Sequence, residues 1–123
     1  MEWKVRGIRG AITVEENNTQ QILEATKECF LELIEKNEVF AEDVASITIT
    51  MTHDLNATFP AKAIRQLAGW KFVPLLCGSE IDVPGGLARC IRLLVLVNTT
   101  RTQQQMEHVY LRDAIVLRPD LDR

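Results

Sequence analysis

The segment ARCIRLLVLV, residues 88–97, is the strongest single indication of the fold of this chain. A run of β-branched and aliphatic residues this dense is typical of a strand inside a β-sheet. Successive side chains of a strand point to opposite faces. One face carries Ile91, Leu93, Val95 and Val97. The other carries Cys90, Arg92, Leu94 and Leu96. A guanidinium among such neighbours needs a partner, either a protein carboxylate or one supplied by a ligand.

The length and composition predict a globular protein with a single domain over residues 1–123. Apolar residues make up 46% of the chain and charged residues 25%, which is ordinary for a folded domain. The net charge of −3 argues against nucleic acid as a partner, because such proteins usually carry a basic excess. A few arginines can still converge on a small anionic molecule.

The cysteines and the apolar runs predict a cytoplasmic protein without a membrane segment. The chain has an odd number of cysteines, Cys29, Cys77 and Cys90, and their spacing shows no pairing pattern. This favours reduced thiols. The first ten residues lack the apolar stretch of a signal peptide. The longest uninterrupted apolar run, LLVLV, is too short to span a bilayer.

Alternation and helical periodicity divide the rest of the chain into strands and helices. We expect strands over residues 3–14, 43–52, 71–77, 87–97 and 114–118, where Pro119 stops the last one. We expect helices over residues 17–37, 58–68 and 102–111. Asn18 or Thr19 can cap the first helix, and Pro60 and Gly69 suit the start and the stop of the second. Gly7 and Gly10 allow a bulge or a close backbone approach in the first strand.

This order of elements predicts an α/β (α+β) fold, a mixed β-sheet with helices on one face. The other face of the sheet is then left to pack on something else, and a homo-oligomer is the simplest candidate. Arginines stand where side chains can converge: Arg9, Arg65, Arg92 and Arg118. A single arginine is more often a surface residue with its stem along apolar surface, and Arg92 departs most from that interpretation.

No motif for a cofactor or a metal is present. The chain has no Walker loop, no complete G-x-G-x-x-G and no C-x-x-C spacing. His53 and His108 have no recognisable triad context. Taken singly, Glu80 is typical of a solvated carboxylate, Cys77 of a small buried residue and Tyr110 of a half-buried ring. The residues alone therefore indicate only an anionic small molecule as ligand.

Four strings together resemble one family, the monofunctional, trimeric class of chorismate mutases. They are RGIRGAITVEENN, FPAKAIRQLAGW, VPLLCGSEIDVPGGLARCIRLLVLV and HVYLRDAIVLRPDL, in the family's order and spacing. The resemblance implies a homotrimer that packs its sheets around a barrel-like core, with active sites between subunits. It implies an isomerase of aromatic amino acid biosynthesis (the shikimate pathway). Such an enzyme converts chorismate to prephenate by a [3,3] rearrangement without a cofactor.

The resemblance also implies roles for individual residues. Arg92 would face the ether oxygen whose bond breaks, Glu80 would balance positive charge near the ring, and Arg9 would bind a side-chain carboxylate together with Tyr110. The remaining substrate contacts would come from Cys77 at the ring hydroxyl, from Phe59, Ala61, Leu75 and Leu117 as an apolar wall, from Lys62 at the ring carboxylate, and from Arg65 and Arg118 at the rim.

Two other functions compete with this one. A trimeric enamine/imine deaminase also holds a carboxylate with an arginine between subunits, but it needs a site for a hydrolytic water. A non-catalytic trimer that binds an anionic ligand would not need an arginine at the ether oxygen. The joint presence of Arg9, Glu80 and Arg92 favours the mutase.

Overall fold

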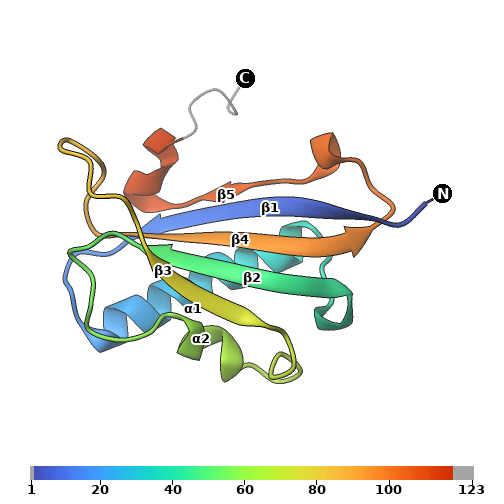
Figure 1. Ribbon diagram of the computed structural model, residues 1–123, viewed down its shortest axis with the longest axis horizontal. Coiled ribbons are helices and arrows are strands. Elements are labelled where there is room, and N and C mark those ends of the chain that lie inside the picture. Colours follow the sequence, from blue (N-terminus) through green and yellow to red (C-terminus); the bar gives the residue numbers. More distant parts are fainter. Residues whose placement is uncertain (1, 118–123) are drawn as a thin grey trace.

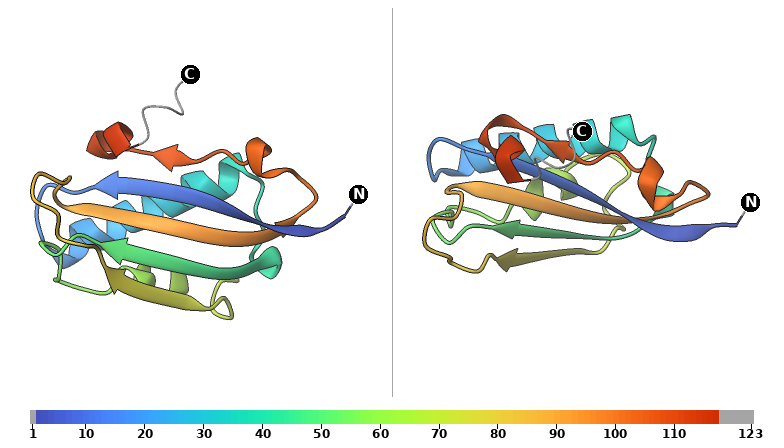
Figure 2. Two further views of the ribbon diagram at one scale, coloured as in Figure 1. Left: turned by 45° about the horizontal axis from the view of Figure 1, so that its top comes forward. Right: turned by 90° about the horizontal axis from the view of Figure 1, so that it is seen from above.

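The computed structural model describes residues 2–117, which form a five-stranded mixed sheet with helices on one face (Figures 1 and 2). The strands are β1 (Lys4–Thr13), β2 (Val44–Met51), β3 (Leu75–Ser79), β4 (Cys90–Thr99) and β5 (Val109–Tyr110). The helices are α1 (Thr19–Lys36) and α2 (Ala61–Arg65), with 3₁₀ turns η1 (Ala41–Asp43), η2 (Gln103–Gln105) and η3 (Arg112–Leu117).

The strand order is β3-β2-β4-β1-β5, so β4 lies at the centre of the sheet. It pairs antiparallel with β1 on one side and with β2 on the other, while β3 and β5 add parallel edges. The interior strand predicted over residues 87–97 is confirmed as β4, which begins at Cys90 and continues to Thr99. The expected mixed α+β sheet with its helices on one face is confirmed.

The main core lies between the sheet and the two α-helices. Ile91, Leu93, Val95 and Val97 are all buried, as the alternation of β4 predicts. From α1, Ile22, Cys29, Phe30 and Leu33 pack against them. The side chain of Asn18 caps α1 by accepting a hydrogen bond from the Gln21 N–H at 2.8 Å.

Gly10 lets α1 approach the sheet closely, which confirms one of the two roles predicted for that glycine. A Cβ at residue 10 would lie 3.0 Å from Cys29 Sγ and 3.1 Å from Leu33 Cδ1. The predicted alternative of a bulge in this strand is wrong, because β1 and β4 pair in continuous register from Lys4↔Thr99 to Thr13↔Cys90.

Several expected elements differ from the structure, mainly near the C-terminus. The helix expected over residues 102–111 is wrong: only the η2 turn is helical, and Val109–Tyr110 instead pairs with β1. Of the strand expected over residues 114–118, the described part lies in the η3 turn, while Arg118 lies outside the described residues. Apolar runs this short do not distinguish a strand from a 3₁₀ turn.

The helix α2 and the strand β3 are also shorter or displaced relative to the prediction. Pro60 is the N-cap of α2, which ends at Arg65 rather than near Gly69. The strand expected over residues 71–77 begins only at Leu75, after Pro74, and continues to Ser79. Proline has no N–H to donate to a sheet ladder, so pairing starts after it.

The second face of the sheet has no helix over most of its area (Figure 2). We call it the open face; it carries the alternate residues of the strands. Val5, Leu76 and Leu94 are exposed there. Only its end near η3 is covered, where Ala114 packs on Ala11 and Cys90 as a small second cluster. Within residues 2–117, no helix is both long and apolar enough to cross a membrane.

Candidate active site

A cavity of about 260 Å³ lies on the open face, over the middle strands of the sheet. It is lined by Arg9, Gly10 and Ala11 of β1, Thr48 and Thr50 of β2, Arg92, Leu93 and Leu94 of β4, Tyr110 of β5, and Leu117 of η3. Among the residues predicted from the sequence, the cavity thus brings together Arg9, Arg92, Tyr110 and Leu117. Regular strands supply almost all of this lining, so the polar groups are held on a rigid surface.

Arg92 is held in place by both neighbouring strands and by Glu80. In the sheet register it lies opposite Thr50 of β2 and Ala11 of β1. Its Nε lies 3.2 Å from Glu80 Oε2, and about half of its side chain is exposed. Glu80 follows β3 directly, is mostly buried, and also accepts a short hydrogen bond from the Thr50 hydroxyl.

Of the two kinds of partner that the sequence allows for Arg92, the structure supplies the protein carboxylate. Glu80 provides it, because its N–H donates to Met51 O at 2.9 Å and so holds the residue beside the end of β2. Thr50 is a site residue that the sequence interpretation missed. The alternation of Thr48 and Thr50 with the buried Ile47 and Ile49 was the signal, since it places both threonines on the Arg92 face.

Arg9 of β1 and Tyr110 of β5 line the cavity on the β1 side of Arg92. The Arg9 N–H donates to His108 Nδ1 at 2.9 Å, which ties the chain just before β5 to β1. Tyr110 stands opposite Ala11 in the parallel register. Its hydroxyl oxygen is buried and has no hydrogen-bond partner among the described residues. A buried hydroxyl in that state is suited to bind a polar group of a ligand.

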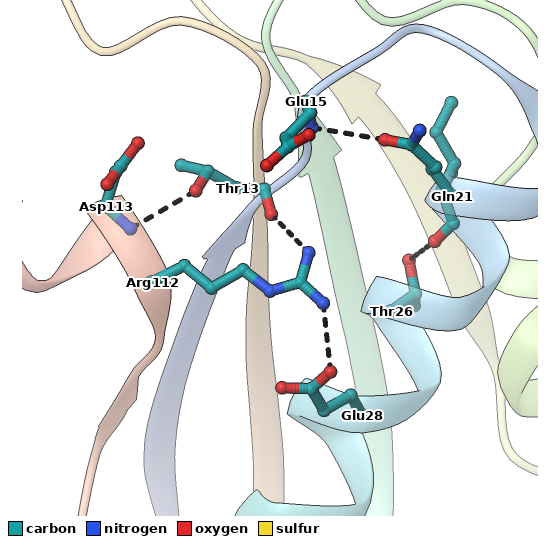
Figure 3. Close-up of polar contacts among 8 residues, drawn as sticks. Thr13, Glu15, Gln21, Thr26, Glu28, Arg112 and Asp113 are labelled. Carbon is teal, nitrogen blue, oxygen red and sulfur yellow. Dashed lines mark hydrogen bonds and ion pairs between the residues drawn. The ribbon is translucent and has the colours of Figure 1, made fainter.

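The η3 turn brings Leu117 to the cavity and is anchored to β1 and α1 (Figure 3). Arg112 has a positive φ of 56°. Its guanidinium donates to Thr13 O at 2.9 Å and lies 3.0 Å from Glu28 Oε1 of α1. The Asp113 N–H donates to Thr13 Oγ1 at 3.2 Å. These contacts fix the direction in which the chain leaves β5. Arg118 lies outside the described residues.

The other predicted substrate contacts lie elsewhere in the chain. Phe59, Ala61, Lys62 and Arg65 lie at or just before α2, which packs beside α1 on the helical face. Phe59, Lys62 and Arg65 are exposed, and Ala61 is buried. None of them is among the residues that line the cavity. Within one chain, then, the predicted site falls into two separated groups.

Leu75 and Cys77 belong to the second group, because they share the helical face of the sheet. They pair with Ile47 and Ile49 of β2, both buried, and pack against the main core. Leu76, opposite Thr48, is the β3 side chain on the Arg92 face and is 70% exposed. The prediction for these strand residues did not use the alternation that separates the two faces.

The thiol under the site is held in its neutral form. Burial raises the pKa of Cys90 to about 11, although the nearby Arg92 acts in the opposite direction. Cys90 is therefore no nucleophile at neutral pH. Within residues 2–117, no cluster of three His, Cys, Asp or Glu side chains could hold a metal ion.

Together these features define an α+β protein whose open sheet face carries a cavity suited to a small anion. Two guanidiniums, an unpaired phenol and an aliphatic wall suit a small ligand with negative charge and apolar carbon. The Arg92–Glu80 pair adds a fixed donor and a fixed negative charge, side by side, with the donor on the central strand.

Known proteins similar to this chain belong to the same structural class and identify its family. The family described as chorismate mutase type I matches residues 5–121. Chorismate mutase AroH of Bacillus subtilis (strain 168) is 50% identical over 117 residues, covering 95% of this chain and 92% of that protein. Chorismate mutase AroH of Thermus thermophilus is 50% identical over 119 residues, covering 96% and 97%.

A solved structure shows the same fold. The chorismate mutase from Clostridium thermocellum superposes with a TM-score of 0.86 at 44% identity, covering 89% of this chain and 97% of that one. The chain belongs to the type I chorismate mutase family. The resemblance seen in the sequence, and the prediction of a chorismate mutase, an isomerase, are confirmed.

Proposed function

We propose that this protein converts chorismate to prephenate in the cavity beside Arg92, without a cofactor, covalent intermediate or proton transfer. The observation that carries the proposal is the geometry of Arg92. A strand bonded on both sides holds this guanidinium, and Glu80 fixes its Nε at 3.2 Å. Such a donor does not need to reorganise when charge appears beside it, which is the basis of electrostatic catalysis.

The chemistry of the rearrangement matches this arrangement. As the ether C–O bond of chorismate lengthens, negative charge builds on that oxygen and on the departing enolpyruvyl fragment. We assign Arg92 to that oxygen. The ring gains partial positive charge, and Glu80, held by Thr50, balances it. The stabilisation is larger in the transition state than in the substrate, so it lowers the barrier rather than merely tightening binding.

Substrate binding and conformation fall to the rest of the cavity. Chorismate is a dianion, and Arg9 with the unpaired Tyr110 hydroxyl suits the side-chain carboxylate. Leu117 and Leu94 supply apolar contact. Holding the compact pseudo-diaxial form brings the two reacting carbons together, which is the entropic part of the rate gain.

We assign the second group of predicted residues to a neighbouring subunit of a homotrimer. The group lies at α2 and β3, away from the cavity of its own chain. The open face leaves Val5, Leu76 and Leu94 exposed, and burying them between sheets would produce a barrel-like core. In this assembly Phe59, Lys62, Arg65 and Cys77 of one subunit complete the cavity of the next, as heterologous contacts in a closed ring allow.

The three thiols support the cytoplasmic location that the sequence predicts. Cys29, Cys77 and Cys90 are free in the structure. Persistent free thiols are characteristic of a reducing compartment.

A direct assay tests the activity. Purified protein is mixed with chorismate, the loss of its ultraviolet absorbance is followed, and prephenate is identified as the product. We expect the protein to accelerate the reaction greatly over the uncatalysed rate in the same buffer. No metal or cofactor should need to be added. An uncatalysed rate with folded protein would end the proposal.

A further inference from the structure

The segment 81–91 joins the two charged residues of the site, and its return to the sheet is fixed by side chains that no substrate contact explains. Glu80 precedes this segment and Arg92 follows it. The segment returns at Arg89 and Cys90, where β4 begins. The precision with which Arg92 enters the cavity therefore depends on what holds Arg89 and Cys90.

Asp54 holds the first of these residues through its backbone. The Arg89 N–H donates to both carboxylate oxygens of Asp54, at 2.9 Å to Oδ2 and 3.2 Å to Oδ1. Arg89 has a positive φ of 49°, a backbone conformation that residues other than glycine adopt only when the surroundings enforce it. The bifurcated bond to Asp54 is such a constraint.

Thr52 holds the second residue and links it to Asp54. Its hydroxyl accepts a hydrogen bond from the Cys90 N–H at 2.9 Å and donates a short one to Asp54 Oδ1. Its own N–H donates to Cys90 O at 3.0 Å. Both backbone groups of Cys90 are thus bound to one residue, which lies just beyond the end of β2.

The carboxyl group of Asp54 is ionised at neutral pH. Partial burial alone would raise the pKa of this carboxyl. The hydrogen bonds from Thr52 and from the Arg89 backbone, together with nearby His53, lower it overall. At neutral pH the group is an ionised acceptor, the form that makes charge-assisted hydrogen bonds of this kind strong.

We propose that Asp54 and Thr52 form a clamp that sets the position of Arg92 relative to Glu80, and that both are positioning residues for the rearrangement. The clamp fixes Arg89 and Cys90, which precede Ile91 and Arg92, while the Thr50 hydroxyl and the backbone of Met51 at the end of β2 fix Glu80. Arg92 and Glu80 are thereby both positioned relative to the end of β2. This inference rests on the proposed function, because Arg92 and Glu80 are its catalytic pair.

The chain offers a matched control on the same segment. Asp82 lies 3.1 Å from His53 Nδ1, with both side chains mostly exposed. Asp82→Ala also removes one carboxylate, from the segment 81–91 itself and two residues beyond Glu80, but it leaves the hydrogen bonds of Asp54 and Thr52 to Arg89 and Cys90 in place. General loosening of the segment and loss of the clamp are therefore separable.

The experiment measures kcat and KM for chorismate at a temperature at which each variant is folded by circular dichroism. Asp54→Ala is expected to lower kcat about 10- to 100-fold, the scale of a small misplacement of a catalytic group, while KM changes less than about threefold because Arg9 and Tyr110 are untouched. Asp82→Ala should keep kcat within about twofold. Equal losses in the two variants, or full kcat in Asp54→Ala, would overturn the clamp.

A second pair of variants decides the question if Asp54→Ala does not fold. Thr52→Val removes the hydroxyl with little change of shape, and Thr52→Ser keeps it. We expect a loss of kcat in Thr52→Val and near-normal turnover in Thr52→Ser; equal behaviour of the two variants contradicts the proposal. The wild type is assayed first. An inactive wild type refutes the proposed function itself, whereas an active wild type with indifferent variants refutes only the clamp.

Discussion

Arg92 Nε and Glu80 Oε2 lie 3.2 Å apart across the end of β2, with the Thr50 hydroxyl bonded to the same carboxylate oxygen. The three residues come from three different elements, and the register of the sheet brings them together. An ion pair this exposed contributes little to stability, so its value lies in fixing a guanidinium where negative charge develops.

Replacing Arg92 by lysine should abolish most of the activity. A lysine ammonium is a point charge on a flexible stem and does not reproduce the planar guanidinium fork. Loss of a central donor of this kind costs about 3 kcal/mol of barrier, or roughly a hundredfold in kcat. Steady-state kinetics with chorismate measures it. Arg101→Lys at the far end of the molecule, where Arg101 pairs with Glu38, is the matched control, and equal kcat in the two variants would remove Arg92 from its role.

Replacing Thr50 by valine should lower kcat by a smaller factor. The change leaves Glu80 with Arg92 but removes the hydroxyl that orients the carboxylate. Loss of one hydrogen bond to a charged group corresponds to about 1.5–3 kcal/mol at most. Kinetic assays of Thr50→Val and Thr50→Ser test this, since serine retains the donor. Should both variants turn over alike, the Thr50 bond has no part in orienting Glu80.

Mixing two variants, each impaired in a different group of site residues, should raise activity above that of either one if the sites lie between subunits. Arg92→Ala inactivates the cavity group, and Arg65→Ala weakens the group assigned to the neighbouring subunit. Random assembly of the two into trimers leaves about a quarter of the sites with both arginines intact. Co-refolding followed by the chorismate assay measures the recovery. The mass from light scattering should be about three times that of the chain; an active monomer would exclude shared sites.

Adding one methyl group at Gly10 should destabilise the fold, whereas the same change at Gly7 should be tolerated. An alanine Cβ at residue 10 would press on Cys29 Sγ and Leu33 Cδ1 at 3.0 and 3.1 Å, but one at residue 7 would meet Leu94 and Leu96 at 3.6 and 3.7 Å. Overpacking of this kind costs about 1–3 kcal/mol. Denaturant titration of both variants gives the comparison, and equal stability would contradict the close approach of α1.

The three thiols should differ in reactivity in the native protein. Burial, followed by the charges of Glu32 and Glu28, raises the pKa of Cys29 to about 12, and burial raises that of Cys90 to about 11. Because thiolate is the reactive form, both stay unmodified at pH 8, and half-buried Cys77 reacts with iodoacetamide first. Peptide mass mapping identifies the labelled residue, with denatured protein as the control. Faster labelling of Cys29 or Cys90 would contradict the burial.

The amino-acid pattern is sufficient to predict the long, regular elements and the family of this chain. The apolar alternation of residues 91–97 predicted the central strand and its buried face, and the periodicity of residues 17–37 predicted α1. Such patterns survive because burial of a repeating apolar face dominates local energetics. Four motifs spread along the chain are sufficient to indicate a chorismate mutase without any knowledge of tertiary contacts.

How those residues meet depends on the three-dimensional packing of the chain. Residues 114–117 of the expected last strand lie in the η3 turn, since the bonds of Arg112 and Asp113 to Thr13 outweigh the weak local preference of a short apolar run. The same packing pairs Arg92 with Glu80, and it sets Leu75 and Cys77 on the opposite face of the sheet from Arg92. Strand order and register bring residues distant in sequence into contact, and neither is written in the periodicity of a single segment.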